Sequence, residues 1–595
     1  MKLLKITILL PLAITLLISG CSFTSFSGRQ ISPTVQDYLN LASQNQGDEQ
    51  HYYQLLAAGQ LLDDNNLNDA EQLLQSLNRI PLNPNNTQQK IILESRLTLQ
   101  KNQPKLALKI LHNVHNLKAL PKPIQIAYFT TASQAHLRNN NLAYCTLAQI
   151  SLNALLQDDS QLPFIWHNLQ TLPTTQLNTL LNRSTSPLLR GWLELAILAK
   201  VNANHPETLV SAIQNWETTY PNHPANKLIP NTQTLSTAST IKIPNQIALL
   251  LPLHGTFAAM GQAIRDGFMT AYYQQSKDLV STPKIKLYDT SLDEDINDIY
   301  NQALTEGADF IIGPLTKSNV KELSNHDSLP VPTITLNYLP ANQNAPTNLI
   351  QYGLSPEQAA NQAASKAWQL GINNILIIVP QNDWGNTIQN AFITRWQSLG
   401  GNISDTLFFS MDNNINTEIT SILHIDQSQA REKELKQLLG EKLKMTLRRR
   451  QDINGIFLVA TPSQARQIRP LLSYYYAGNL PVVSISTIYA GYRNTLSDRD
   501  LNNIYFNDIP LLLSQNPTIV QLRQQFEKLW PDNYRLNNRL FGLGFDSFHL
   551  SLLFNRLIAL PNFAIEGATG QLYLNNNQII RELSWAKFIN GIPQI

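Results

Sequence analysis

The sequence predicts a mixed fold, in which an all-helical N-terminal domain of TPR-like repeats precedes a two-lobed α/β domain. Residues 33–230 carry apolar side chains at helical spacing with almost no strand pattern. From residue 246 onward, short apolar strands alternate with helices, and this plan occurs twice in tandem. We therefore expect a helical scaffold joined to two parallel sheets that helices cover on both faces.

The composition is polar but poor in charge. Charged residues make up 14% of the 595 residues, and 44 basic against 42 acidic side chains leave a net charge of +2. The 60 Asn and 48 Gln give 108 amides, which outnumber the 86 charged residues. This balance provides no electrostatic basis for binding nucleic acid. Two cysteines, Cys21 and Cys145, are too few for a disulfide framework or a Cys-rich metal site.

Residues 1–20 have the pattern of a signal peptide. Two lysines precede an apolar run from Ile6 to Ile18, which is too short to span a bilayer. The run leads to Ser19-Gly20-Cys21, which resembles a bacterial lipobox; the alternative is an ordinary signal peptide with a chance cysteine. The resemblance implies lipid attachment at Cys21, and Ser22 at the sorting position implies transfer to the outer membrane. Residues 21–32 are expected to form a flexible, lipidated tether.

Three helix–turn–helix units repeat within residues 33–230. Ala70, Ala107 and Ala143 occupy equivalent positions, 37 and 36 residues apart, where a second helix packs on the first. This spacing is close to the tetratricopeptide period of about 34 residues, and a looser fourth unit is expected at 188–220. Stacked helix pairs favour a protein-binding or spacer arm, and generic helical packing is the alternative. Cys145 lies in an apolar helical pattern and is expected to be a buried structural residue.

The boundaries of the second domain follow from a change of composition and period. Residues 231–245 are rich in Thr, Ser and Pro and are predicted to be a linker. Residues 246–595 are predicted to form the two lobes, with a cleft at the carboxyl ends of the strands. We expect lobe 1 to comprise about 246–353 and 506–565, and lobe 2 about 354–505 and 566–595.

Polar and turn-forming residues that follow strands of the first lobe are candidates to face this cleft. They are Leu253, Gly255, Asp289, Thr290, Ser291, Gly313 and Pro314, together with Asp546 near a late helix. Either they bind a small polar ligand, or they are turn and cap residues. Gly542-x-Gly544 is expected to begin that late helix, but it lacks the third glycine of a dinucleotide fingerprint.

The strongest charge cluster lies in an insert between Met411 and Asn454, which is longer than a strand–helix connection needs. Its cations are Lys442, Lys444, Arg448, Arg449 and Arg450. At a solvated helix end they would interact with the helix dipole. Alternatively, they contact an acidic partner surface or an anionic cell-wall polymer. The run 474–476, three tyrosines, either anchors an interface or packs a helix end on the sheet.

Catalytic and metal-binding motifs are missing from the sequence. GxSxG, HExxH, GxxxxGK[ST] and CxxC do not occur. His112 and His115 lie three residues apart without an acidic or cysteine partner, so we expect them at the surface. The sequence therefore predicts no enzyme activity, no cofactor and no metal, and a cell-wall hydrolase is disfavoured.

Several strings resemble known families. Residues 247–255 with 261–268, and 307–315, resemble the opening of type I periplasmic binding proteins. Combined with the lipobox and the repeat arm, they resemble the LpoA family of outer-membrane lipoproteins, which strings at 289–291, 354–357 and 567–588 also fit. The resemblance covers the region from 245 to the end well.

This resemblance implies a non-enzymatic lipoprotein that is anchored in the outer membrane on the periplasmic side. It implies that the protein binds a class A penicillin-binding protein, which is a peptidoglycan synthase, and stimulates its peptide cross-linking. Contact with peptidoglycan itself is a further expectation. The alternative is a solute-binding lipoprotein of a transporter or sensor, which would not need a repeat arm.

Overall fold

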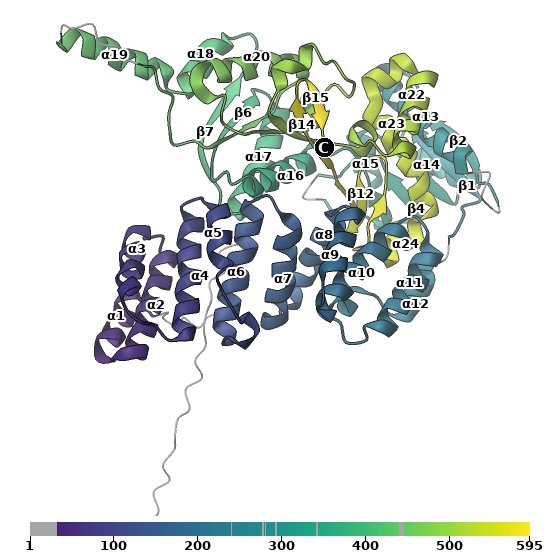
Figure 1. Ribbon diagram of the computed structural model, residues 1–595. Coiled ribbons are helices and arrows are strands. Elements are labelled where there is room, and N and C mark those ends of the chain that lie inside the picture. Colours follow the sequence, from purple (N-terminus) through teal and green to yellow (C-terminus); the bar gives the residue numbers. More distant parts are fainter. Residues whose placement is uncertain are drawn as a thin grey trace, which may run out of the picture.

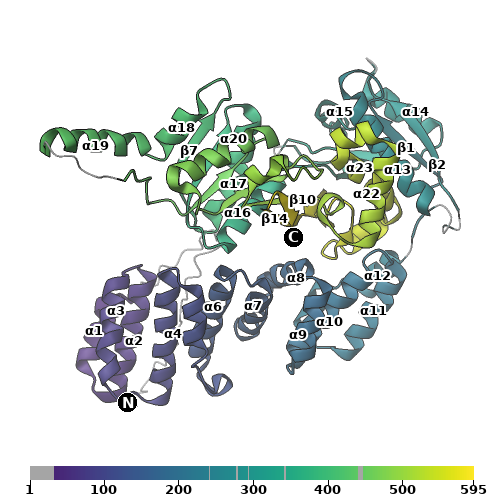
Figure 2. The same cartoon turned by 45° about the horizontal axis from the view of Figure 1, so that its top comes forward.

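The computed structural model describes residues 33–239, 241–275, 279, 281–291, 294–340, 343–439 and 446–595. The expected signal peptide, the tether with Cys21 and Ser22, and the cations Lys442 and Lys444 lie outside these residues. A curved helical arm runs beneath two α/β lobes (Figure 1), and a turned view keeps the same arrangement (Figure 2). Within the described ranges, no helix combines the length and the apolar character that crossing a bilayer requires.

The arm is built from consecutive helix pairs, as the sequence predicts. Its helices are α1 (Val35–Gln44), α2 (Gly47–Asp63), α3 (Leu67–Ser76), α4 (Pro84–Gln100), α5 (Pro104–Leu111), α6 (Lys122–Arg138), α7 (Leu142–Leu156), α8 (Leu162–Thr171), α9 (Thr174–Arg183), α10 (Pro187–Val201), α11 (Pro206–Thr219) and α12 (Thr232–Ser239). Proline occupies the first helical turn of many of them, where its missing N–H costs no hydrogen bond.

The repeat positions are confirmed. Ala70 on α3, Ala107 on α5 and Ala143 on α7 are at most 1% exposed, so each second helix packs closely on the first. Cys145 is also 1% exposed, and burial raises the pKa of its thiol to about 12. A thiol in that environment stays protonated and unreactive, as expected of a structural cysteine.

Asparagine shapes the turn inside each of these units. Asn65, Asn102 and Asn140 have φ values of 58°, 59° and 56° in the turns α2–α3, α4–α5 and α6–α7. Asparagine enters this left-handed region more readily than other residues with a side chain. Part of the amide excess in the composition therefore has a structural use.

The predicted linker 231–245 contains a helix, which corrects the expectation of an unstructured connection. In α12, Leu235 and Ala238 are 2% and 0% exposed and belong to the core of the arm. These two apolar residues lie on one helix face at i and i+3, and this short pattern is obscured by the surrounding Thr and Ser. The connection proper is therefore the short stretch between α12 and the first strand.

The first lobe has an eight-stranded sheet in the order β11-β12-β13-β5-β4-β3-β1-β2. Its strands are β1 (Gln246–Leu251), β2 (Lys284–Asp289), β3 (Phe310–Ile312), β4 (Ser328–Thr335), β5 (Thr347–Gln351), β11 (Ile565–Glu566), β12 (Gln571–Asn575) and β13 (Gln578–Glu582). Helices of this lobe are α13 (Ala258–Gln275), α14 (Ile296–Thr305), α15 (Lys317–Leu323), α22 (Pro517–Leu529), α23 (Pro531–Leu552) and α24 (Phe554–Ala559). Strands β1 to β5 are parallel.

The second lobe has a seven-stranded sheet in the order β15-β14-β10-β9-β8-β6-β7. Its strands are β6 (Asn374–Pro380), β7 (Asn402–Phe409), β8 (Gly455–Leu458), β9 (Val482–Ser484), β10 (Ile504–Asp508), β14 (Ser584–Ile589) and β15 (Ile592–Gln594). Its helices are α16 (Pro356–Gln369), α17 (Asp383–Ser398), α18 (Ile415–Ile422), α19 (Ile425–Leu439), α20 (Pro462–Leu472) and the short α21 (Pro510–Leu513). Helix α19 extends away from the lobe (Figure 1).

Two expected lobe boundaries are wrong. Strand β10 completes the second sheet, so 506–508 do not belong to lobe 1. Strands β12 and β13 pair antiparallel and join the first sheet next to β5, so 566–582 do not belong to lobe 2. The chain thus crosses between the lobes three times, after β5, β10 and β13. A two-residue period identifies a strand but does not say which sheet it joins.

Glycines bring two helices of the first lobe into close contact. A Cβ at Gly544 would lie 1.9 Å from the Ile264 carbonyl oxygen, and one at Gly267 would lie 2.1 Å from that of Phe541. Helices α13 and α23 cross at these points. Gly542 and Gly544 therefore lie inside α23 and do not begin a helix, contrary to expectation, because α23 already starts at Pro531.

A loop between α24 and β11 joins the arm to the first lobe. The Asn562 carbonyl accepts hydrogen bonds from Trp166 Nε1 at 2.7 Å and Gln170 Nε2 at 2.6 Å, both on α8. The Ala564 amide donates to Gln170 Oε1 at 2.8 Å. The Phe563 ring lies 4.9 Å from the Trp166 ring and belongs to the core of the arm. Arm and lobe therefore share one hydrophobic core.

Contacts on either side extend this interface between the arm and the lobes, which we call the seam. Asn204 exchanges two hydrogen bonds with the Glu566 backbone, at 3.0 and 3.2 Å, and Lys200 Nζ lies 3.6 Å from the Glu566 carboxylate. Toward the second lobe, the Arg138 guanidinium lies 5.9 Å from the centre of the Trp368 ring on α16. The arm thus contacts both lobes.

Glu582 on β13 is an ionisable group within the seam. Its carboxylate lies 3.5 Å from His167 Nε2 on α8, and its side chain is 22% exposed. Burial raises the pKa of Glu582 to about 7. Burial, and then the charge of Arg395 on α17, lower the pKa of His167. The Tyr573 ring on β12 lies 5.4 Å from the His167 ring and completes the surroundings.

We predict that Glu582→Gln removes a pH dependence of stability. Because the folded-state pKa exceeds the unfolded value, the carboxyl stabilises the fold below about pH 4.5, and this stability is lost as the pH rises to about 7. At pH 8 the variant should therefore exceed the wild type in unfolding free energy by up to about 3 kcal/mol. Denaturant titration at pH 5 and pH 8 measures the difference. Glu434→Gln on exposed α19 is the control, and equal pH slopes for wild type and Glu582→Gln would contradict the prediction.

Candidate functional site

The candidate cleft residues of the first lobe lie at the carboxyl edge of its sheet. The parallel register pairs Leu251 with Asp289, so the loops after β1 and β2 emerge side by side. Gly313 and Pro314 follow β3, which neighbours β1 on its other side. Leu253, Gly255, Thr290 and Ser291 belong to the same loops. The structure thus brings these seven residues to one edge, as the sequence predicts.

Asp289 organises that edge through its carboxylate. Oδ1 accepts hydrogen bonds from the Leu253 amide at 2.9 Å, the Ser291 amide at 3.0 Å and the Ser291 hydroxyl at 2.5 Å. Oδ2 lies 2.5 Å from His254 Nδ1. Burial alone would raise the pKa of Asp289, but bonds from Ser291, Leu253 and His254 outweigh it and lower the pKa to about 2. The carboxylate is thus engaged by its own loops, which favours the turn interpretation over a ligand site.

Gly313 and Pro314 at this edge also have structural tasks. A Cβ on Gly313, whose φ is 110°, would lie 2.2 Å from the Leu250 carbonyl oxygen, so only glycine fits there. The Leu336 amide donates to the Pro314 carbonyl at 3.0 Å and ties β3 to β4. The Thr290 hydroxyl is buried and has no hydrogen-bond partner among the described residues.

Asp546 does not face the cleft, which corrects its place among the candidates. It lies in the middle of α23 and is 2% exposed. Its carboxylate accepts bonds from the Ala568 amide at 2.7 Å, the Thr569 amide at 2.8 Å and the Tyr352 hydroxyl at 3.1 Å. Burial raises the pKa of Asp546 despite these bonds. Because Tyr352 follows β5, the residue ties α23 to the first crossover between the lobes.

Arg539 on α23 fixes the lobes to one another. Its guanidinium donates to both oxygens of Asp508 at the end of β10, at 2.9 and 2.6 Å. It also donates to the carbonyls of Ser486 and Tyr489, both at 2.9 Å. Asp508 is 0% exposed, so this pair is an interior link between a helix of lobe 1 and a strand of lobe 2.

The N-terminal half of α23 lies against the carboxyl edges of both sheets. Asn533 Nδ2 donates to the Ala259 carbonyl, just after β1, at 3.3 Å. Asn538 Nδ2 donates to the Ala490 carbonyl, after β9, at 3.3 Å. A Cβ on Gly491 would lie 2.2 Å from Asn538 Nδ2, so the two lobes approach closely here. The N-terminal half of α23 therefore contacts both lobes through its own side chains.

Two open surface pockets lie elsewhere. One of about 520 Å³ is lined by Asn102, Gln103, Lys105, Arg138, Asn140 and Gln369, where the arm meets the second lobe. The other, of about 420 Å³, lies on α9 to α11 and includes Glu194, Ile197 and Trp216. Neither contains a candidate cleft residue.

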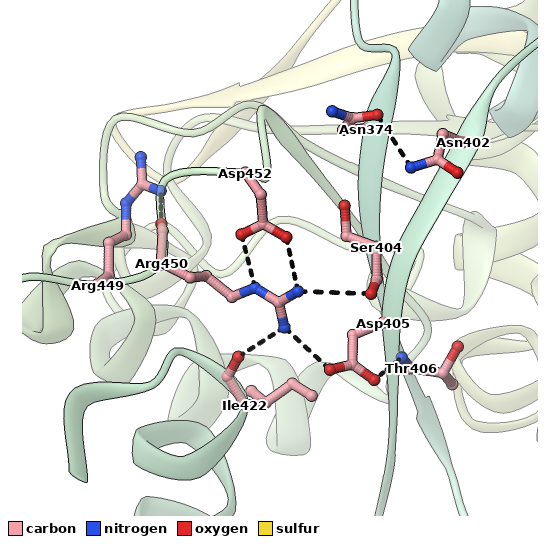
Figure 3. A network of polar contacts seen from close by, with 9 residues as sticks. All are labelled: Asn374, Asn402, Ser404, Asp405, Thr406, Ile422, Arg449, Arg450 and Asp452. Atoms are coloured by element: carbon pink, nitrogen blue, oxygen red, sulfur yellow. Dashed lines mark hydrogen bonds and ion pairs between the residues drawn. The ribbon is translucent and has the colours of Figure 1, made fainter. Parts of the chain in front are cut away.

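The arginine cluster divides into separate roles. Arg450 is 8% exposed and donates to Asp405 at 2.9 Å, to Asp452 at 2.9 and 2.7 Å, and to the carbonyls of Ser404 and Ile422 (Figure 3). Hydrogen bonds from its guanidinium to Asp452, and then to Asp405, raise its pKa despite burial. Arg450 therefore holds the insert in place and is not available to a partner.

Arg448 and Arg449 remain as candidates for a contact. Arg448 is exposed, and within the described part of the chain its one hydrogen bond runs from its backbone amide to Ser428. The Arg449 side chain is half-buried and donates to two backbone carbonyls, that of Arg450 at 2.6 Å (Figure 3) and that of Tyr476 at 3.0 Å. The sequence alone could not separate these three neighbours, because one of the two carboxylates that bind Arg450, that of Asp405, lies 45 positions away.

Metal and thiol chemistry find no support in the part of the chain that the structure describes. No group of three or more His, Cys, Asp or Glu there could hold a metal ion. His112 and His115 are exposed, as expected.

Comparison with known proteins matches nearly the whole chain. The family model described as "LppC putative lipoprotein" matches residues 29–591. A protein named "Penicillin-binding protein activator LpoA" from Photobacterium profundum is 28% identical over 596 residues, covering 98% of this chain and 96% of the relative. A protein of the same name from Aliivibrio fischeri is 27% identical over 590 residues, covering 97% and 96%.

A solved structure has the same extent. Full-length LpoA from Haemophilus influenzae, in a monoclinic crystal form, has a TM-score of 0.51 at 27% identity. The match covers 95% of this chain and 98% of that one, so it includes both the helical arm and the lobes.

We predict that Arg539→Gln destabilises the fold by about 3–5 kcal/mol, because it leaves the buried Asp508 carboxylate without its counter-ion. The double variant Arg539→Gln with Asp508→Asn should recover part of this loss. Arg535→Gln, which removes only an exposed cation over the Tyr492 ring, should cost far less than Arg539→Gln. Denaturant unfolding of the three variants measures these costs, and equal values for Arg539 and Arg535 would refute the interior link.

Proposed function

The chain belongs to the LppC lipoprotein family, and we propose that it is a lipid-anchored activator of a class A penicillin-binding protein. Its relatives carry the name penicillin-binding protein activator, and the likeness to them spans 96–98% of both chains. This full-length agreement is the observation that carries the proposal, because the arm and both lobes are retained together.

The proposed location is the outer membrane, on its periplasmic side. The lipobox at Cys21 and the family description as a lipoprotein support an acyl anchor. Two or more acyl chains give stable attachment, whereas a single chain binds only reversibly. Ser22 at the sorting position supports the outer rather than the inner membrane.

The proposed mechanism is allosteric and requires no chemistry by this chain. An activator shifts its partner toward the competent state only if it binds that state more tightly. The seam at Asn562 and the link at Arg539 support a body that keeps one shape, so binding costs little ordering entropy. A non-catalytic role agrees with the sequence, which lacks catalytic motifs.

The alternative, a solute-binding lipoprotein, receives less support. A receptor needs a free edge at the carboxyl ends of its strands and lobes that can close on a ligand. Here the Asp289 carboxylate is engaged by its own loops, and α23 already bonds across the lobes. Contact with peptidoglycan along the arm is a further proposal that rests on the same anchoring.

The activator proposal predicts a saturable rise in peptide cross-linking. The full-length chain in detergent is added to purified class A penicillin-binding proteins, and glycan polymerisation and cross-linking are measured separately. We expect cross-linking by one synthase to rise about fivefold or more, as a coupling free energy above about 1 kcal/mol gives. No binding and no change of rate with any synthase would reject the proposal. Calorimetry with amino acids and muropeptides tests the receptor alternative in parallel.

The anchor proposal predicts that Cys21→Ala abolishes incorporation of labelled palmitate and releases the protein from outer-membrane fractions. Cys145→Ala is the matched control, because that thiol is buried and should keep both properties. Palmitate labelling that persists in Cys21→Ala would contradict lipid attachment at this position.

A further inference from the structure

The outer end of the second lobe carries an exposed cluster of aromatic and cationic side chains. It comprises Tyr474, Tyr476, Arg448 and Arg449, and we name it the Tyr–Arg patch. Tyr474 and Tyr476 are 74% and 50% exposed. The segment with the arginines precedes β8 and the turn with the tyrosines precedes β9, so the patch lies at the amino ends of the strands. It is thus on the side opposite to the interlobe contacts of α23.

The backbone beneath the patch is held firmly. The Arg450 amide donates to the Leu423 carbonyl at 2.9 Å, and its side chain is pinned by Asp405 and Asp452 (Figure 3). Arg449 Nε then donates to the Tyr476 carbonyl at 3.0 Å and connects the two segments. A preorganised surface loses little entropy when a partner binds.

Tyr476 adopts a conformation that its residue type disfavours. After α20 the chain forms a wide turn (Ser473–Ala477), in which Tyr476 has φ 63° and ψ 15°. A left-handed conformation costs an L-residue with a side chain about 1–2 kcal/mol, and such strain gathers at ligand contacts. Since Tyr476 is 50% exposed, burial in the core does not offset this cost. Among the described residues, asparagine occupies eight of the eleven left-handed non-glycine positions, but it is absent here.

The charges of the patch are open to an anion. Among the residues that the structure describes, no carboxylate bonds to the side chain of Arg448 or Arg449, whereas the Arg450 side chain bonds to two carboxylates. Guanidinium groups bind carboxylates in a bidentate manner, and exposed tyrosines are typical anchors of interfaces. In a chain with only 14% charged residues, two arginines that bond to no carboxylate of the described residues, next to two exposed tyrosines, form an unusual combination.

We infer that the Tyr–Arg patch is the docking site for a short acidic segment of the penicillin-binding protein, a partner that rests on the proposed function. Carboxylates of the segment meet Arg448 and Arg449, and its apolar side chains pack on Tyr474 and Tyr476. The surface area of four residues is far smaller than the roughly 800 Å² that each partner buries in a standard interface, so the patch fits a linear segment and not a folded domain. A purely anionic polymer would use the cations and leave the rings without a role.

The test compares Tyr476→Asn and Arg448→Gln in the full-length chain with the wild type. Asparagine suits the left-handed backbone, so Tyr476→Asn should unfold at the same temperature as the wild type or higher. Each variant should bind the synthase roughly tenfold more weakly, the loss typical of an interface anchor. Tyr52→Asn, which removes a ring that is 40% exposed on the arm, and Arg431→Gln on α19 are the matched controls and should bind normally.

Two further measurements sharpen the outcome. Raising the salt concentration should weaken binding of the wild type more than binding of Arg448→Gln, because the variant lacks one screened contact.

If the wild type stimulates the synthase and both patch variants do so equally well, the inference is wrong while the proposed function stands. If the variants lose affinity for polyphosphate but keep it for the synthase, the patch binds anionic polymers instead. If the wild type activates no class A synthase, the proposed function is wrong, and so is the assignment of the patch to a segment of the synthase.

Discussion

The shape of the molecule depends on one backbone carbonyl, that of Asn562, which both Trp166 and Gln170 bind from the arm. The loop that presents it also inserts Phe563 into the helical core, so arm and lobe cannot part without exposing aromatic surface. The second lobe is then held to the first through Arg539 and Asp508. These two links join the arm and the two lobes through buried contacts.

The α/β lobes illustrate how a receptor-like architecture serves a different task. The strands still direct their carboxyl ends toward a common edge, and the loops there keep polar residues. Those polar groups bond within the protein, however, and the N-terminal half of α23 bonds to both lobes. The edge between the lobes is therefore occupied by contacts within the chain itself, and the fold alone does not determine a function.

The sequence sufficed for features that depend on local periodicity and failed for those that depend on distant pairing. Ala70, Ala107 and Ala143 identify the helix pairs because a small residue is needed at each close contact. The assignment of β12 and β13 to the first sheet could not be predicted, since their alternation fits either sheet. The role of Arg539 could not be predicted, because nothing near it in the sequence indicates that it pairs with the buried Asp508. Likewise, the role of Arg450 differs from those of Arg448 and Arg449, and this difference becomes apparent only when the position of Asp405 in space is known.

The asparagine turns of the arm have a consequence for its mechanics. The left-handed asparagine turns and the close packing at Ala70, Ala107 and Ala143 set the angle within each helix pair through backbone geometry and apolar contact. Partly exposed ion pairs, such as Arg96 with Asp63 and Lys101 with Glu71, join neighbouring helices at the surface, where dissolved ions screen them. Salt therefore acts on the outside of the arm and leaves the packed interior, which sets its curvature, in place.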